Sequence, residues 1–148
     1  MTLYRPEPRH LLIADDSVSK RTEMRIAAEE AETGLVIVEA DSARLALGII
    51  HATAERIAIL LSDHSFDGET LNGIDLIRAL RHRNAEAFIM LITRHPERSE
   101  EFVRRELLAR EAGANDALSC FMGHGGEWGD YLYATLAEWK RKQQGGAN

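Results

Sequence analysis

The segment His10-Leu-Leu-Ile-Ala-Asp-Asp-Ser17 places a continuously apolar run directly before two aspartates. A second segment, Ile59-Leu-Leu-Ser-Asp63, repeats this arrangement, with an apolar run that again ends in an aspartate. Apolar runs without alternation are typical of strands in a parallel sheet that helices cover on both faces. The two segments therefore predict an α/β fold in which acidic residues follow buried strands.

Short apolar runs and longer amphipathic segments alternate along the chain, which is the pattern of βα units. Gly34, Ser42 and Gly113 stand where helices are expected to end or begin. We expect a doubly wound five-stranded parallel sheet of the flavodoxin-like (βα)5 class. The expected strands are Leu11–Ala14, Leu35–Glu39, Ile57–Ser62, Ala87–Ile92 and Ala117–Cys120, and the expected helices are Ser17–Thr33, Ser42–Ala54, Gly73–Arg83, Ser99–Ala112 and Glu127–Gln143.

Length and composition indicate one domain over residues 1–148, with a core of about residues 10–142 and flexible ends at 1–9 and 143–148. The formal net charge of −6 argues against nucleic acid as a direct partner. No charged-then-apolar leader is recognised in the opening residues and no apolar run approaches membrane-spanning length, so we expect neither a leader nor a membrane span. The single cysteine, Cys120, excludes an internal disulfide. We expect a cytoplasmic protein that does not contact the membrane.

Carboxylates follow two of the expected strands, at the edge where parallel sheets place their functional crevice. Asp15, Asp16 and Asp63 would repel one another there by roughly 4 kcal/mol per pair at about 4 Å. No lysine or arginine stands at these strand ends, so a bound cation is the expected counter-charge. The all-oxygen ligand set favours Mg²⁺, or Mn²⁺, over zinc. In the alternative interpretation, Asp15 and Asp16 only cap the following helix.

Five segments in this order resemble the receiver domains of response regulators. They are His10-Leu-Leu-Ile-Ala-Asp-Asp-Ser17, Ile59-Leu-Leu-Ser-Asp63, Asn72-Gly-Ile-Asp-Leu-Ile-Arg-Ala-Leu-Arg81, Met90-Leu-Ile-Thr93 and Gly113-Ala-Asn-Asp116. The resemblance implies that Asp63 accepts a phosphoryl group from a histidine kinase or a histidine phosphotransfer protein. It also implies that Asp15, Asp16, Asp63 and the backbone carbonyl of Ser65 hold Mg²⁺, and that Thr93 is the switch hydroxyl.

The sequence departs from the receiver pattern at the fifth strand. Cys120 stands where these domains generally have a lysine, and Ala117 where an aromatic switch residue is usual. The lost lysine is a charge-assisted contact on the order of 1.5–3 kcal/mol. Arg94 or His95, just after Thr93, could reach inward, although neither is an evident substitute. Asp67, in a lengthened loop, is a competing acceptor.

Three functions remain open at this point. In the first, the chain is a phosphorylatable receiver, not an enzyme beyond its own phosphorylation and dephosphorylation. It would signal to an unknown downstream protein, or as a homodimer through the fourth helix, fifth strand and fifth helix. In the second it is a pseudo-receiver, an interaction module without phosphorylation. The third is a haloacid-dehalogenase-type phosphatase, which the adjacent Asp15-Asp16 pair disfavours.

Overall fold

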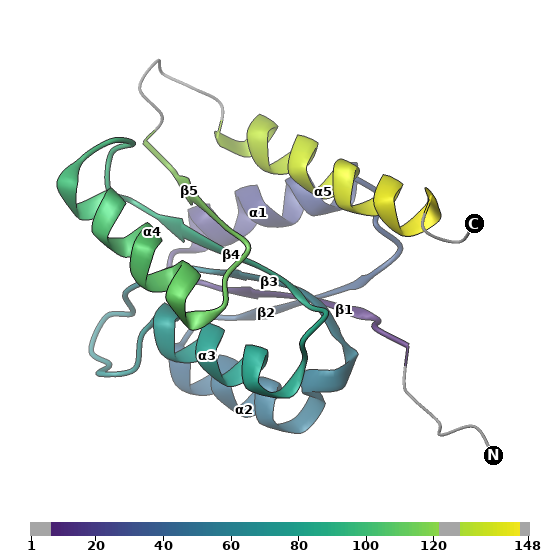
Figure 1. Ribbon diagram of the computed structural model, residues 1–148, viewed down its shortest axis with the longest axis horizontal. Coiled ribbons are helices and arrows are strands. Elements are labelled where there is room, and N and C mark those ends of the chain that lie inside the picture. The colour runs from purple at the N-terminus through teal and green to yellow at the C-terminus, as the bar shows by residue number, and fades with distance from the viewer. Residues whose placement is uncertain (1–6, 122–127, 146–148) are drawn as a thin grey trace.

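The computed structural model describes residues 7–121 and 128–145. Five parallel strands form one sheet in the order β2-β1-β3-β4-β5, with helices on both faces (Figure 1). The strands are β1 (His10–Ala14), β2 (Val36–Ala40), β3 (Ile57–Ser62), β4 (Phe88–Thr93) and β5 (Asp116–Ser119). The helices are α1 (Val18–Glu30), α2 (Ala43–Thr53), α3 (Gly73–Arg83), α4 (Glu100–Ala112) and α5 (Trp128–Gly145), with a short 3₁₀ turn, η1, at Ala54–Arg56. The predicted fold class is confirmed.

Alternate strand residues feed two separate cores. Leu11 and Ile13 of β1 point to the face covered by α1 and α5, where Leu132 and Leu136 of α5 are fully buried. Leu12 of β1 points to the opposite core, beneath α2 and α3. Figure 1 shows α1 beside α5 on one face, and α2 and α3 together on the other. Burial on both faces explains why the strands read as continuous apolar runs.

The strand order changes direction between β1 and β3. From β1 the chain proceeds to β2 on one side and then returns to place β3 on the other side. The register pairs Ala14 with Ser62, so the residues that follow these two lie next to each other. The N–H of Asp63 donates to the carbonyl of Ala14 at 2.8 Å. This switch point is where open α/β sheets bind their ligands.

Local signals set most helix ends. Ser42 caps α2 by accepting from the N–H of Leu45, and Gly113 ends α4 in the left-handed region. Both roles agree with the sequence-based prediction. The prediction for α1 was too long, because the helix ends at Glu30, before Glu32 and Gly34 adopt positive φ values. Three strands, β2, β4 and β5, are shifted by one residue from their predicted bounds, and β1 begins one residue earlier than predicted, at His10.

The predicted last helix was too short at its C-terminal end, since α5 continues to Gly145. Its predicted first residue, Glu127, lies outside the described residues, as do residues 1–6 of the N-terminal segment and residues 146–148 of the tail. In the described part of the chain, no helix is both long and apolar enough to cross a membrane.

Candidate functional site

Three aspartates converge where β1 and β3 end. One carboxylate oxygen from each of Asp15, Asp16 and Asp63 lies within 4.8 Å of the others. Asp15 is fully buried and Asp63 nearly so, whereas Asp16 is half-buried. The cluster forms because the neighbouring register of β1 and β3 carries all three side chains to one edge.

The two adjacent aspartates do not cap α1. The helix cap is Ser17, whose hydroxyl accepts from the N–H of Lys20. Asp15 Oδ1 instead accepts from the N–H of Ser17 at 2.8 Å, and Asp16 Oδ2 accepts from the N–H of Asp67 at 2.8 Å. The alternative in which Asp15 and Asp16 serve only as helix caps is therefore wrong.

Asp63 has one engaged and one available oxygen. Its Oδ1 accepts from the N–H of His64 at 2.8 Å. Its Oδ2 accepts no hydrogen bond from the residues that the structure describes. Asp63 lines a cavity of about 250 Å³ together with Thr93 and several loop residues. The other lining residues are Asp16, His64, Ser65, Asp67, Arg94 and His95.

The remaining predicted residues lie around this cavity. Thr93 ends β4 and is buried, and its Oγ1 accepts a long 3.5 Å hydrogen bond from the N–H of His95. Ser65 is exposed, with its hydroxyl 2.8 Å from His64 Nδ1. Asp67 is exposed at the rim and does not belong to the carboxylate cluster. Arg94 is exposed and His95 half-buried, and neither forms an ion pair within the described residues.

A lysine that the sequence analysis missed lies inside the acidic cluster. Lys20 is buried, and its Nζ is 2.9 Å from Asp15 Oδ2 and 3.2 Å from Asp63 Oδ1. Helix side chains tilt toward the helix N-terminus, and the N-terminus of α1 lies at the end of β1. Lys20, in the first turn, therefore reaches back to the strand ends. No lysine or arginine stands at the strand ends in the sequence, but Lys20 reaches them from α1, so a bound cation is not the only source of positive charge.

Burial dominates the electrostatics of Asp63. It raises the pKa of this carboxyl to about 6, although Lys20 lowers it, and the neighbouring Asp15 adds to the increase. Burial alone would lower the pKa of Lys20, but the Asp63 and Asp15 carboxylates outweigh it and raise that pKa. Both pKa values are therefore raised. For Asp63, burial outweighs the attraction of Lys20, and for Lys20 the two carboxylates together outweigh burial.

Cys120 follows β5 and is half-buried beside the same cluster. Burial raises the pKa of its thiol to about 11, with Lys20 opposing this increase. The thiol is therefore protonated at neutral pH, and a reactive thiolate is disfavoured. Its backbone N–H donates to the carbonyl of Thr93 at 2.9 Å, which joins the ends of β4 and β5.

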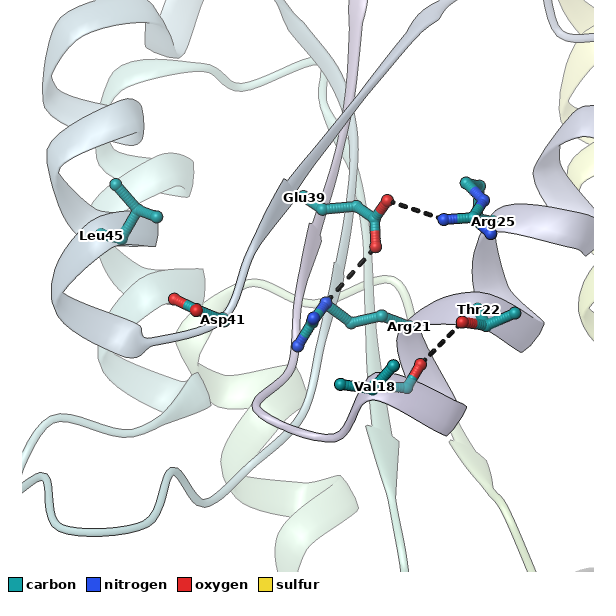
Figure 2. A pocket seen from close by; sticks show the side chains of 7 residues that line it. All are labelled: Val18, Arg21, Thr22, Arg25, Glu39, Asp41 and Leu45. Atoms are coloured by element: carbon teal, nitrogen blue, oxygen red, sulfur yellow. Dashed lines mark hydrogen bonds and ion pairs between the residues drawn. The ribbon is translucent and has the colours of Figure 1, made fainter.

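A second cavity of about 350 Å³ lies next to the acidic site, between α1, β2 and the start of α2 (Figure 2). Figure 2 shows Glu39 between Arg21 and Arg25, at 3.3 and 3.2 Å. Both guanidinium groups are thus already paired. Arg21 Nη1 also donates to the carbonyl of Asp15 at 2.9 Å, which supports the turn that presents the acidic cluster.

A family model described as "Response regulator receiver domain" matches residues 11–120. The chain belongs to this family. The match begins with β1 and ends at Cys120, so it contains the whole carboxylate cluster and Lys20. This receiver domain is therefore one component of a two-component system.

Solved receiver domains share its fold. The REC domain of AraT, a response regulator from Geobacillus stearothermophilus, is 20% identical with a TM-score of 0.69, covering 95% of this chain and 98% of that one. A receiver domain from Rhodospirillum rubrum is 11% identical with a TM-score of 0.69, covering 89% and 94%. The chemotaxis protein CheY4 of Vibrio cholerae is 22% identical with a TM-score of 0.64, covering 88% and 98%. No curated protein matched the chain.

Proposed function

We propose that this receiver domain accepts a phosphoryl group on Asp63 from a phosphohistidine, carried by a histidine kinase or a histidine phosphotransfer protein. The observation that supports this is the convergence of the three carboxylates within 4.8 Å, next to a cavity of about 250 Å³. Phosphoryl transfer requires an in-line nucleophile and charge stabilisation more than elaborate covalent chemistry. Asp63 Oδ2, which accepts no hydrogen bond from the described part of the chain, is a suitable nucleophile.

The transfer is a simple displacement at phosphorus. A bond forms between a carboxylate oxygen of Asp63 and phosphorus, while the bond from phosphorus to the histidine nitrogen breaks. The imidazole leaves with the bonding electron pair, so no additional reactant is needed. Asp63 reacts as the carboxylate, and the half-buried His64 and buried Thr93 limit the access of water to the product.

The donor set around Asp63 suits a hard cation. Asp15, Asp16, Asp63 and the backbone carbonyl of Ser65 would hold Mg²⁺, or Mn²⁺, through oxygen atoms alone. When bound, this ion would neutralise the negative charge on the phosphoryl oxygens. Thr93, which lines the same cavity, would donate its hydroxyl to the phosphoryl group and report the modification.

The exposed side of α4 is the proposed contact surface for a downstream protein. Val103, Leu107 and Leu108 are exposed apolar residues on this helix. A second copy of the chain, docked through α4, β5 and α5, would use the same surface. In this proposal the domain is cytoplasmic and acts by binding, with catalysis limited to its own phosphorylation and dephosphorylation.

The second candidate function is that of a pseudo-receiver, which binds partners without being phosphorylated. One specific observation favours it: Lys20 already supplies a positive charge between Asp15 and Asp63 without a metal ion. In this alternative, the Lys20 ammonium offsets part of the negative charge of the three carboxylates, in place of a metal ion. The two candidates differ in what the domain does when offered a phosphodonor.

The test is phosphorylation by a small donor. The protein is incubated with Mg²⁺ and acetyl phosphate, and the intact mass is compared with that of Asp63→Asn and Asp67→Asn variants. We expect a base-labile phosphoryl adduct in the wild type and in Asp67→Asn, but not in Asp63→Asn. The absence of an adduct and of beryllofluoride binding would favour the pseudo-receiver, and continuous phosphate release from small phosphoesters would favour a phosphatase.

A further inference from the structure

Lys20 is an unusual residue for this chain. The sequence has 18 basic residues, of which only three are lysines: Lys20, Lys140 and Lys142. The last two lie near the end of α5, where Lys142 is exposed. Lys20 is the only one that is buried, with 7% of its surface exposed. Most basic residues of this chain are arginines, but the one buried in the acidic cluster is a lysine with a compact ammonium group.

The ammonium of Lys20 retains hydrogen-bonding capacity. It has three N–H donors, and its two close contacts are the ion pairs with Asp15 Oδ2 and Asp63 Oδ1. These two contacts can occupy at most two of the three donors, so at least one N–H has no partner among the described residues. A buried ammonium with an unsatisfied donor is costly, and an added anionic oxygen next to it would be strongly stabilised.

Cys120 lies near the ammonium that enters from α1. The Lys20 charge acts on the thiol by lowering its pKa, against the effect of burial. A lysine at position 120 would bring a second ammonium to the same carboxylates. Like charges in a buried site repel each other strongly. The pair Lys20 and Cys120 therefore supplies one positive charge, carried by the helix and not by the strand.

We infer that Lys20 is the phosphoryl-binding cation of this domain, reaching from α1 to the position that a fifth-strand lysine would otherwise occupy. The inference rests on the proposed phosphorylation of Asp63. When a phosphoryl group is attached to Asp63, its oxygens add negative charge beside an ammonium that lies 3.2 Å from Oδ1. Lys20 then exchanges part of its contact with the carboxylates for contact with the phosphoryl oxygens.

None of the other nearby basic side chains is as well placed. Arg105 is near enough for its charge to interact with Asp63, but its ion pair is with Glu101, at 2.7 Å. Arg94 is exposed at the mouth of the cavity, and His95 is half-buried there. His95 is held by its backbone, whose carbonyl accepts from the Ser119 hydroxyl at 2.6 Å. In the described residues, Lys20 is the only cation that forms an ion pair with Asp63.

The test moves the ammonium from one side of the site to the other. Beryllofluoride affinity with saturating Mg²⁺ and the rate of phosphorylation by acetyl phosphate are measured for the wild type, Lys20→Met, Lys20→Arg and the double variant Lys20→Met/Cys120→Lys. In the reaction with acetyl phosphate, a carboxylate oxygen of Asp63 forms a bond to phosphorus. The bond between phosphorus and the acetyl oxygen breaks, and acetate leaves. The exposed Lys142→Met variant is the matched control.

We expect Lys20→Met to bind beryllofluoride about 10- to 100-fold more weakly, the effect of one lost charge-assisted contact. Lys20→Arg should be intermediate, because a planar guanidinium does not match a compact ammonium site. The double variant should recover most of the loss, and Lys142→Met should equal the wild type. Thermal unfolding in Mg²⁺ verifies that each variant is folded. If Lys20→Met does not fold, Lys20→Arg and the double variant still decide the question.

Two failures are distinguishable. If the wild type is phosphorylated and Lys20→Met binds beryllofluoride equally well, the inference is wrong and the proposed function stands. If the wild type neither reacts nor binds, the proposed function fails and the inference fails with it. A gain of Mg²⁺ or beryllofluoride binding in Lys20→Met would show that the ammonium blocks the site, which also overturns the inference.

Discussion

Gly73, the first residue of α3, lies directly against the backbone carbonyl of Asp63. A Cβ atom at position 73 would overlap that carbonyl oxygen and approach the Cα of His64 at 3.1 Å. The N–H of Gly73 also donates to the carbonyl of His64 at 2.7 Å. The start of α3 and the end of β3 are thus joined through backbone atoms, and this contact supports the position of the Asp63 side chain.

Replacing Gly73 by alanine should therefore disturb the site as well as the fold. We expect Gly73→Ala to lower the free energy of unfolding by about 1–3 kcal/mol, because the clash is with backbone atoms that cannot rotate away. It should also slow phosphorylation by acetyl phosphate. Gly48→Ala is the control, since nothing lies within 4 Å of a Cβ there. In the middle of α2 it should stabilise the protein by up to about 1 kcal/mol. Equal effects of the two changes would contradict this prediction.

The stability of the metal-free protein should depend on the charge of Asp63. Its pKa is about 6 in the folded protein, against an ordinary value of 3.8. Between these values the folded state holds a proton that the unfolded state has lost, so stability falls as pH rises through this window. The shift corresponds to at most about 3 kcal/mol. Lys20, whose pKa is raised above 10.5, stays charged throughout.

The measurement is urea unfolding in EDTA between about pH 4 and pH 8. We expect the stability of the wild type, relative to that of Asp63→Asn, to decline as pH rises to about 6 and then to level off. A difference that does not change with pH would show that Asp63 is ionised in the folded protein at all these values.

Magnesium should stabilise the wild type through Asp16. A ligand that binds only the folded state adds about 1.4 kcal/mol at tenfold excess over its Kd. Asp16→Asn removes the charge but keeps an oxygen that can accept from the N–H of Asp67. We expect Mg²⁺ to raise the Tm of the wild type and of Asp41→Asn, an exposed control, but not that of Asp16→Asn. An equal rise in all three would exclude Asp16 as a ligand.

Arg81 should be required for the packing of α3 against the turn after α4. Its guanidinium donates to the carbonyls of Gly113, Asn84 and Ala85 and to Asn115 Oδ1, at 2.9 to 3.1 Å. A lysine cannot reproduce this planar set of donors. We expect Arg81→Lys to cost about 1–3 kcal/mol in chemical denaturation, because carbonyl groups lose their donors. Arg44→Lys, at an exposed position, should change stability by no more than about 0.5 kcal/mol.

Local patterns in the sequence were sufficient for the sheet and for the acidic residues. Ile57–Ser62 and Gly73–Arg83 have the predicted bounds, and the other strands agree to within one residue. This follows because strands buried on both faces require continuous apolar runs, and a residue that directly follows a strand is carried to the sheet edge by the backbone itself. To predict that Asp15, Asp16 and Asp63 converge, one further assumption was enough, namely that β1 and β3 are neighbours in the sheet.

Only the tertiary structure placed Lys20 and explained Gly73. Lys20 comes five residues after Asp15, beyond a turn, so nothing in the spacing alone says where its flexible side chain ends. The direction of α1 decides this, since helix side chains tilt toward the N-terminus and that end faces the carboxylates. Gly73 similarly depends on how closely α3 approaches β3. The sequence determined which charges follow the strands, whereas packing between elements decided which charge neutralises them, because that choice depends on contacts between separate elements.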